Sequence, residues 1–121
     1  LECLTPEYLT ELFRTPFQVI PRLIKAIHFN DKYPENKNVR ILCQKNRFIE
    51  VHCVKWMHRN KKYIIKHMVE TGHDIIETNM DNELDGIKNS LITYLNKYNT
   101  DNKIKERVNE NAELAILNNS K

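Results

Sequence analysis

The chain of 121 residues is poor in glycine, with only Gly72 and Gly86. Phosphate-cradling loops, dinucleotide fingerprints and glycine-framed nucleophile elbows each need several closely spaced glycines, so the sequence excludes all three. The chain also lacks long apolar runs, and we therefore expect no contact with a membrane interior. The first residues, LECLTPEYL, contain neither the basic region nor the apolar core of a signal peptide, so we expect none here.

Cysteine is also scarce, and three separated thiols do not make a disulfide framework. Such usage fits a reducing intracellular compartment. We expect Cys43 and Cys53 to be small buried or half-buried residues that face each other across a hairpin. Together with His52 and His58 they are zinc-ligand types, but there is no C-x-x-C pair, and neighbouring residues of a strand point to opposite faces. We therefore expect no metal and no cofactor.

Charge is distributed unevenly along the chain, whose formal net charge is +3. Residues 1–69 contain thirteen Lys or Arg and six Asp or Glu, a net charge of +7. Residues 70–121 contain six Lys or Arg and ten Asp or Glu, a net charge of −4. A polyanion would therefore meet the first half of the chain rather than the second.

Two helices are predicted at the start of the chain. Thr5-Pro6-Glu7 supplies an N-cap hydroxyl, a proline at a position that needs no N–H and an acid in the first turn, so residues 6–13 are predicted to be helical. Thr15-Pro16 repeats this start, and apolar residues at helical spacing continue to position 28. Pro21 interrupts the second helix and is expected to restart or kink it.

A loop over residues 30–38, rich in Asn, Asp and Pro, separates these helices from two β-like runs. The runs are Val39–Cys43 and Phe48–Val54, and the short polar link between them is typical of a hairpin. Ile49 is expected to point inward. We expect Trp56 to extend or close this small sheet and interpret it as a core residue, with base stacking as the alternative.

The remainder of the chain is predicted to be helical. A helix begins after Asn60, a suitable N-cap, and Gly72 is expected to interrupt it near its end. Its apolar stripe is predicted to consist of Tyr63, Ile64, His67 and Met68. Two further helices are predicted, over roughly 82–98 and 104–116. The fold class is therefore α+β: two N-terminal helices, a small antiparallel hairpin or sheet, then a helical C-terminal half.

These elements divide into a head of residues 1–80 and a helical tail of residues 81–121. The tail carries more apolar surface than the head can obviously cover, so we expect it to pack on the head or on another chain. Residues 82–117 are therefore predicted to form the interface of a homo-oligomer, most simply a dimer. The positions that lack a clear partner are Ile104, Val108, Ala112 and Ile116.

The segment from Val51 to Val69 contains no acidic residue. Its basic side chains, interleaved with Trp56 and Tyr63, have the chemistry to neutralise phosphates and stack a base, and a helix N-terminus adds backbone N–H donors. We predict that DNA or RNA binds to Lys55, Arg59, Lys61, Lys62 and Lys66. A solvated face that only keeps the protein soluble is the alternative.

The densest group of polar residues lies between the second helix and the first strand. It consists of His28, Asn30, Glu35, Asn36 and Asn38, and we name it the polar knot. Asn side chains commonly bond nearby backbone groups, so we expect hydrogen bonds within the loop and to the edge of the hairpin. The alternative is a metal-dependent nuclease that uses the loop of His28, Asn30 and Glu35.

The same residues carry a resemblance to a known family. The pattern Ile27-His28-Phe29-Asn30, then Pro34-Glu35-Asn36, Asn38 and Trp56, resembles an uncharacterised domain of giant (nucleocytoplasmic large) DNA virus proteins over about residues 3–80. In that family the domain often follows a C2H2-type or zinc-ribbon-like finger, which implies association with nucleic acid. No such finger occurs within these 121 residues. The resemblance implies a location inside the infected host cell, in the virus factory or the nucleus.

The function expected from these observations is that of a non-enzymatic viral module. It would bind nucleic acid through the basic head, or support protein assembly through the helical tail.

Overall fold

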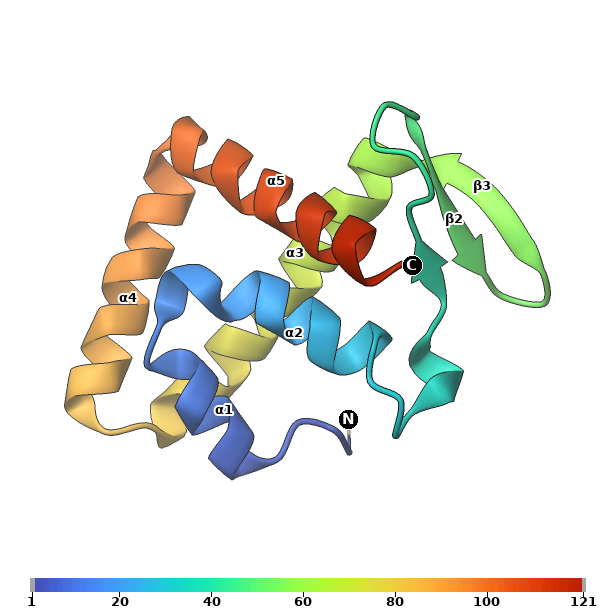
Figure 1. The fold of residues 1–121 in the computed structure, drawn as a ribbon. Coiled ribbons are helices and arrows are strands. Elements are labelled where there is room, and N and C mark those ends of the chain that lie inside the picture. The colour runs from blue at the N-terminus through green and yellow to red at the C-terminus, as the bar shows by residue number, and fades with distance from the viewer. Residues whose placement is uncertain (1, 121) are drawn as a thin grey trace.

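A computed structural model describes residues 2–120, and within them the chain forms five α-helices and one three-stranded antiparallel sheet. The helices pack together in one body, and the sheet lies at the edge of that body, beside the C-terminal ends of α2 (Val19–His28) and α5 (Asn102–Asn119) (Figure 1). The predicted α+β class, with two N-terminal helices, a small sheet and a helical C-terminal half, is confirmed. Every helix among the described residues is too short or too polar to span a bilayer.

The two N-terminal helices are α1, Pro6–Phe13, and α2, Val19–His28. The hydroxyl of Thr5 caps α1 by accepting a hydrogen bond from the backbone N–H of Tyr8 at 3.2 Å. Thr15 does not repeat this role, because its hydroxyl donates backward to the carbonyl of Leu12 and a 3-10 turn, η1 (Pro16–Gln18), precedes α2. Pro21 lies in the first turn of α2, where a backbone N–H has no helical partner, so it neither restarts nor breaks the helix.

The sheet contains β1 (Val39–Arg40), β2 (Phe48–His52) and β3 (Trp56–Asn60), in that spatial order. A second 3-10 turn, η2 (Pro34–Asn36), leads into β1. β1 is shorter than predicted because the backbone N–H of Ile41 leaves the ladder and donates to the hydroxyl of Ser120, just beyond α5. Ile49 points inward as predicted and is fully buried.

Two expectations for the sheet are wrong. Trp56 does begin a third strand, but it is half-exposed and does not belong to the core. Cys43 and Cys53 are exposed free thiols rather than buried residues, because Cys43 lies in the β1–β2 loop and Cys53 in the β2–β3 turn.

Helix α3, Lys61–Asn79, begins at the predicted cap, with the side-chain oxygen of Asn60 accepting from the N–H of Tyr63. The predicted apolar stripe is wrong at Tyr63, which is 70% exposed, and at His67, which is also exposed. Its other two members, Ile64 and Met68, are half-buried and pack against the core. The expectation that Gly72 interrupts the helix is also wrong. The face that α3 buries comprises Lys61, Ile65, Val69, Gly72, His73 and Ile76.

Gly72 of α3 lies against Ile20 of α2, and Gly86, in the helix that follows α3, serves as its matched control. A Cβ atom at Gly72 would lie 2.6 Å from Cδ1 of Ile20, whereas a Cβ at Gly86 would meet nothing within 4 Å. Both glycines are helical, so alanine would gain up to about 1 kcal/mol of helix propensity at each. We expect Gly86→Ala to raise the free energy of unfolding by about 0.5–1 kcal/mol.

At Gly72 the same gain is opposed, because the terminal Cδ1 methyl of the buried Ile20 must move away from the new Cβ atom. We therefore expect the free energy of unfolding of Gly72→Ala to lie about 1 kcal/mol below that of Gly86→Ala. Urea unfolding of both variants checks the pair, and equal stabilisation by the two substitutions would show that α2 and α3 are not tightly packed at this point.

The C-terminal helices are α4 (Asp85–Thr100), reached through the 3-10 turn η3 (Met80–Asn82), and α5 (Asn102–Asn119). α5 crosses the helical body, packs on α2 and α3, and ends beside β1 (Figure 1). Val108, Ala112 and Ile116 are buried, and Ile104 is packed against the core. The interpretation that this stripe lacks a partner is therefore wrong. A homodimer through residues 82–117 is therefore not required to cover this stripe, and it stays a prediction.

A buried histidine links α3 to α4. Nδ1 of His73 lies 2.8 Å from the carbonyl oxygen of Val69, so Nδ1 carries the proton and Nε2 accepts from the hydroxyl of Tyr94 at 2.9 Å. The ring also stacks on Tyr98, with centroids 4.0 Å apart. Burial lowers the pKa of His73, although nearby Glu77 and Asp74 act in the opposite direction. The histidine is therefore neutral in the folded protein at neutral pH.

This burial predicts acid sensitivity. The pKa of His73 is lowered in the folded state, so as pH falls below about 6.5 the unfolded chain takes up a proton that the folded chain does not. The stabilisation is complete above pH 6.5 and is lost as the pH falls toward the folded pKa. We expect the free energy of unfolding to drop by roughly 1 kcal/mol more between pH 7.5 and 5.5 in the native chain than in His73→Phe.

Urea titrations at the two pH values measure this difference. His67→Phe, at an exposed position of the same helix, is the control and should keep the native pH dependence. An unchanged pH dependence in His73→Phe would contradict the prediction.

Candidate nucleic-acid interface

The face of the sheet turned away from the helices carries aromatic and charged side chains. In register, Arg40 of β1 lies opposite Glu50 of β2, and Glu50 lies opposite His58 of β3. Alternation places Phe48 and His52 on the same face as Glu50, and Trp56 on the same face as His58. We call this set the outer sheet face: Arg40, Phe48, Glu50, His52, Trp56 and His58. The opposite face includes Val39 and Ile49, which are buried in the core.

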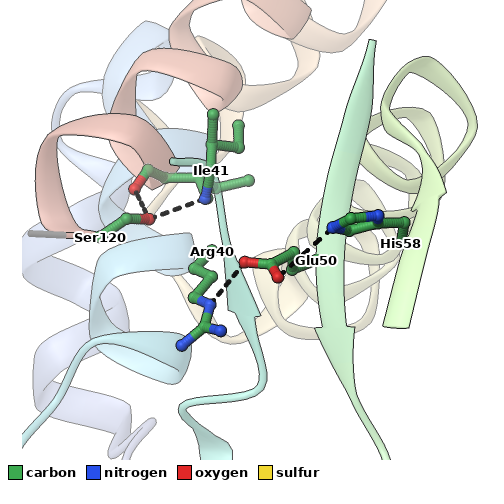
Figure 2. Close-up of polar contacts among 6 residues, drawn as sticks. Arg40, Ile41, Glu50, His58 and Ser120 are labelled. Atoms are coloured by element: carbon green, nitrogen blue, oxygen red, sulfur yellow. Dashed lines mark hydrogen bonds and ion pairs between the residues drawn. The ribbon is translucent and has the colours of Figure 1, made fainter. Parts of the chain in front are cut away.

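Glu50 joins the three strands of this face. Its carboxylate accepts a hydrogen bond from Nε of Arg40 at 2.7 Å, and its other oxygen lies 3.5 Å from Nε2 of His58. Figure 2 shows Glu50 between these two side chains, with Arg40 and His58 reaching it from the neighbouring strands. The hydrogen bond from Arg40 lowers the pKa of Glu50, so the carboxylate is ionised and holds the guanidinium in place.

Arg40 in turn covers an aromatic ring. Its guanidinium carbon lies 3.8 Å from the ring centroid of Trp56, a cation–π contact, and the His52 ring lies 5.1 Å from the same indole. These three residues form one aromatic platform at the end of the sheet next to the β2–β3 turn. The indole is held by its neighbours while part of its surface stays open to solvent.

A second platform lies at the other end of β2. The rings of Phe48 and His58 stack at 6.1 Å with an interplanar angle of 18°, and the guanidinium of Arg47 lies 5.2 Å from the Phe48 ring. Phe48 is 40% exposed. The outer sheet face therefore presents two aromatic platforms, each with an arginine, separated by the Glu50 carboxylate.

The basic residues predicted from the sequence do not form one surface. Lys55 lies in the β2–β3 turn, next to the Trp56 platform, whereas Arg59 pairs with Ile49 and so belongs to the opposite face of the sheet. Lys62 and Lys66 are exposed on α3 and line a depression together with Glu106, Glu110 and Glu113 of α5. The segment from Val51 to Val69 contains no acidic residue, but in the fold acidic residues of α5 lie beside its lysines.

Lys61 is withdrawn from the surface altogether. It is 8% exposed, and its ammonium donates to the carbonyl of Gln44 at 2.8 Å and pairs with Glu113 at 3.3 Å. This side chain joins the start of α3 to the β1–β2 loop and to α5, so it holds the fold together and is not free to contact phosphate.

The structure brings together three members of the polar knot. Nδ1 of His28 lies 2.8 Å from the side-chain oxygen of Asn38 and 3.1 Å from the backbone carbonyl of Asn36. The side chain of Asn30 accepts from the backbone N–H of Lys32, two residues further along. Glu35 is exposed on η2 and stands apart from the bonds made by His28. The knot reaches the sheet through the carbonyl of Asn38, which accepts from the N–H of His52 at 2.8 Å.

Metal chemistry gains no support from this arrangement. Across residues 2–120, no three His, Cys, Asp or Glu side chains are placed to hold one ion. His28 uses Nδ1 within the knot, and the three residues of the nuclease alternative, His28, Asn30 and Glu35, do not converge on a common point through any hydrogen bond in this part of the chain.

Sequence reasoning missed Arg40, Arg47, Phe48 and His52 as site residues. The alternation of Phe48, Glu50 and His52 in β2 was a usable signal for a shared face. It could not show that Arg40 and Trp56 meet on that face, because the pairing register of β1 and β3 is not written in the local pattern.

No family model, curated protein or solved structure matches this chain. The interpretation of the site therefore rests on the chemistry of the outer sheet face.

Proposed function

We propose that this chain is a non-enzymatic module that binds single-stranded nucleic acid through its outer sheet face. The observation that carries the proposal is the pair of exposed aromatic platforms, Arg40–Trp56–His52 and Arg47–Phe48–His58, on an uncovered sheet face. Aromatic rings and arginine planes on sheets are the groups on which unpaired bases stack, with little dependence on sequence.

The geometry favours single strands over duplexes. Bases of a duplex are already stacked on each other, and they become available to protein rings only when unpaired. The two platforms lie at opposite ends of a four-residue span of β2, about 13 Å apart at the usual rise of a strand. They would therefore hold two separate bases, and the exposed cations Arg47 and Lys55 flank the path of the backbone between them.

The resemblance to an uncharacterised domain of giant DNA virus proteins supports the same class of function, since its companion fingers imply association with nucleic acid. On this proposal the chain acts within the infected cell, in the virus factory or the nucleus. The homodimer predicted through residues 82–117 is a separate hypothesis, because the outer sheet face requires no second copy.

Fluorescence anisotropy with a labelled twelve-nucleotide oligo-uridine, repeated with oligo-thymidine, tests the proposal. We expect saturable binding at 50 mM salt and a modest salt dependence. The slope of log K against log salt should be about −1.5, from about two phosphate contacts at roughly −0.7 each. An unlabelled duplex of equal length should compete at least about tenfold less well, because its bases are not free to stack. Absence of binding, or equal competition by the duplex, would contradict the proposal.

A further inference from the structure

A cavity of about 220 Å³ lies between α2 and α3, away from the outer sheet face. Its wall is mainly aliphatic, formed by Ile20, Leu23, Ile24, Ile27, Met68 and Ile75. Ile20, Leu23 and Ile24 are buried at its base, whereas His67 and Thr71 are exposed, so the cavity opens to solvent on one side. It is larger than the ~150 Å³ apolar cavity that accommodates a benzene molecule.

Three polar residues also line the cavity: His28, His67 and Thr71. His28 ends α2, and the N-terminal half of α3 lies toward the same side of the molecule, next to the sheet (Figure 1). The cavity therefore has an apolar body with a small number of polar groups, which is the usual composition of a small-molecule site.

The polar knot determines what His28 offers to a ligand. The backbone carbonyl of Asn36 can only accept a hydrogen bond, so it selects the imidazole tautomer that carries its hydrogen on Nδ1 of His28. Nε2 is then an acceptor, and it has no hydrogen-bond partner among residues 2–120. The knot thus fixes both the orientation and the tautomer of the histidine.

Thr71 is an acceptor for the same reason. Its hydroxyl donates to the carbonyl of His67 at 2.9 Å, and only the lone pairs of its oxygen remain for a ligand. Both of these side chains can therefore only accept a hydrogen bond from a ligand. A carboxylate or a phosphate, which only accepts, does not match them.

We propose that the α2–α3 cavity binds a small apolar molecule that carries one hydroxyl group, of the size of a primary alcohol with about six to eight carbon atoms. The aliphatic chain lies among the Ile, Leu and Met side chains. The hydroxyl donates its hydrogen to Nε2 of His28 or to the oxygen of Thr71. This site is independent of nucleic-acid binding.

Titration of hexan-1-ol into the ¹⁵N-labelled full chain, followed by NMR, tests the site. We expect saturable shifts of the backbone amides of Ile27, Thr71 and Ile75, with a Kd below about 1 mM. Hexanoate at pH 8 has the same chain length but no hydrogen to donate, and it should bind at least about tenfold more weakly. Non-saturable shifts with hexan-1-ol, or equal affinity for hexanoate, would overturn the proposal.

A cavity-filling substitution gives a second test. Ile75→Phe adds volume at the lining and should remove binding of hexan-1-ol. Ile92→Phe makes the same change at an exposed position of α4 and should leave the Kd unchanged within about twofold. If Ile75→Phe keeps the native circular dichroism spectrum and still binds hexan-1-ol, the ligand lies elsewhere and the proposal fails. If that variant does not fold, the comparison of hexan-1-ol with hexanoate on the native chain decides.

Discussion

Replacement of Lys61 by methionine is expected to lower the free energy of unfolding by about 2–3 kcal/mol. Methionine keeps an unbranched apolar side chain that is only one atom shorter, but it removes the three donors. The carbonyl of Gln44 and the carboxylate of Glu113 would then lose a partner in a region where Lys61 is only 8% exposed. Breaking a buried ion pair typically costs about 3–5 kcal/mol, and the partial exposure of Glu113 places this pair below that range.

Lys62→Met is the matched control, since Lys62 is the next residue of the same helix but is exposed. It should change the free energy of unfolding by less than about 0.5 kcal/mol. Urea unfolding measures both variants. Equal stability of Lys61→Met and the native chain would show that Lys61 is free in solution, and would return it to the set of phosphate-binding candidates.

Replacement of Trp56 by alanine is expected to weaken binding of single-stranded oligo-uridine by about 10- to 100-fold. The removal of one stacked base–aromatic contact costs about 1–3 kcal/mol. Trp56 is also the ring on which the Arg40 guanidinium lies, at 3.8 Å from the ring centroid, so the same substitution releases that cation from its fixed position. Because Trp56 is half-exposed and outside the core, most of the loss should be seen in affinity rather than in stability.

Phe17→Ala controls for the general effect of removing an exposed aromatic ring. Phe17 is 47% exposed and packs against Tyr94 of α4. Helix α4 lies on the opposite side of the helical body from the sheet (Figure 1). The substitution should leave the affinity for oligo-uridine unchanged within about twofold. Fluorescence anisotropy on the folded variants gives both values. Equal affinity of Trp56→Ala and the native chain would remove the Trp56 platform from the proposed interface, whatever the native chain binds.

Local sequence determined most of the secondary structure. Thr5 and Pro6 start α1, Asn60 starts α3, and the helix predicted over roughly 82–98 corresponds to α4, because capping bonds and helical spacing are short-range properties of the chain. The alternation of residues in β2 likewise predicted that Ile49 points into the core, where it is buried.

The predictions from sequence were wrong where the same type of side chain can be either buried or exposed. Lys61 lies in a run of basic residues that suggests a polyanion-binding face. It is nevertheless buried and forms an ion pair with Glu113, which is more than fifty positions away in the sequence. In α3, apolar residues also recur at helical spacing on two sides. One side faces solvent, and the other faces α2 and α5. Hydrophobicity alone did not separate them, because Gly72 and His73 lie on the buried face while Tyr63 does not.

What the sequence by itself determined is therefore the α+β class, the order of the helices around a small sheet, and the starts of α1 and α3. Only the tertiary structure decided which faces are covered, because burial depends on contacts between residues distant in the chain. Those contacts place α5 over α2 and α3, withdraw Lys61, and bring Arg40 of β1, Glu50 of β2 and Trp56 and His58 of β3 onto one face. A strand that slips by one residue exchanges its two faces, so the outer sheet face exists only because register and packing together hold Val39 and Ile49 inside.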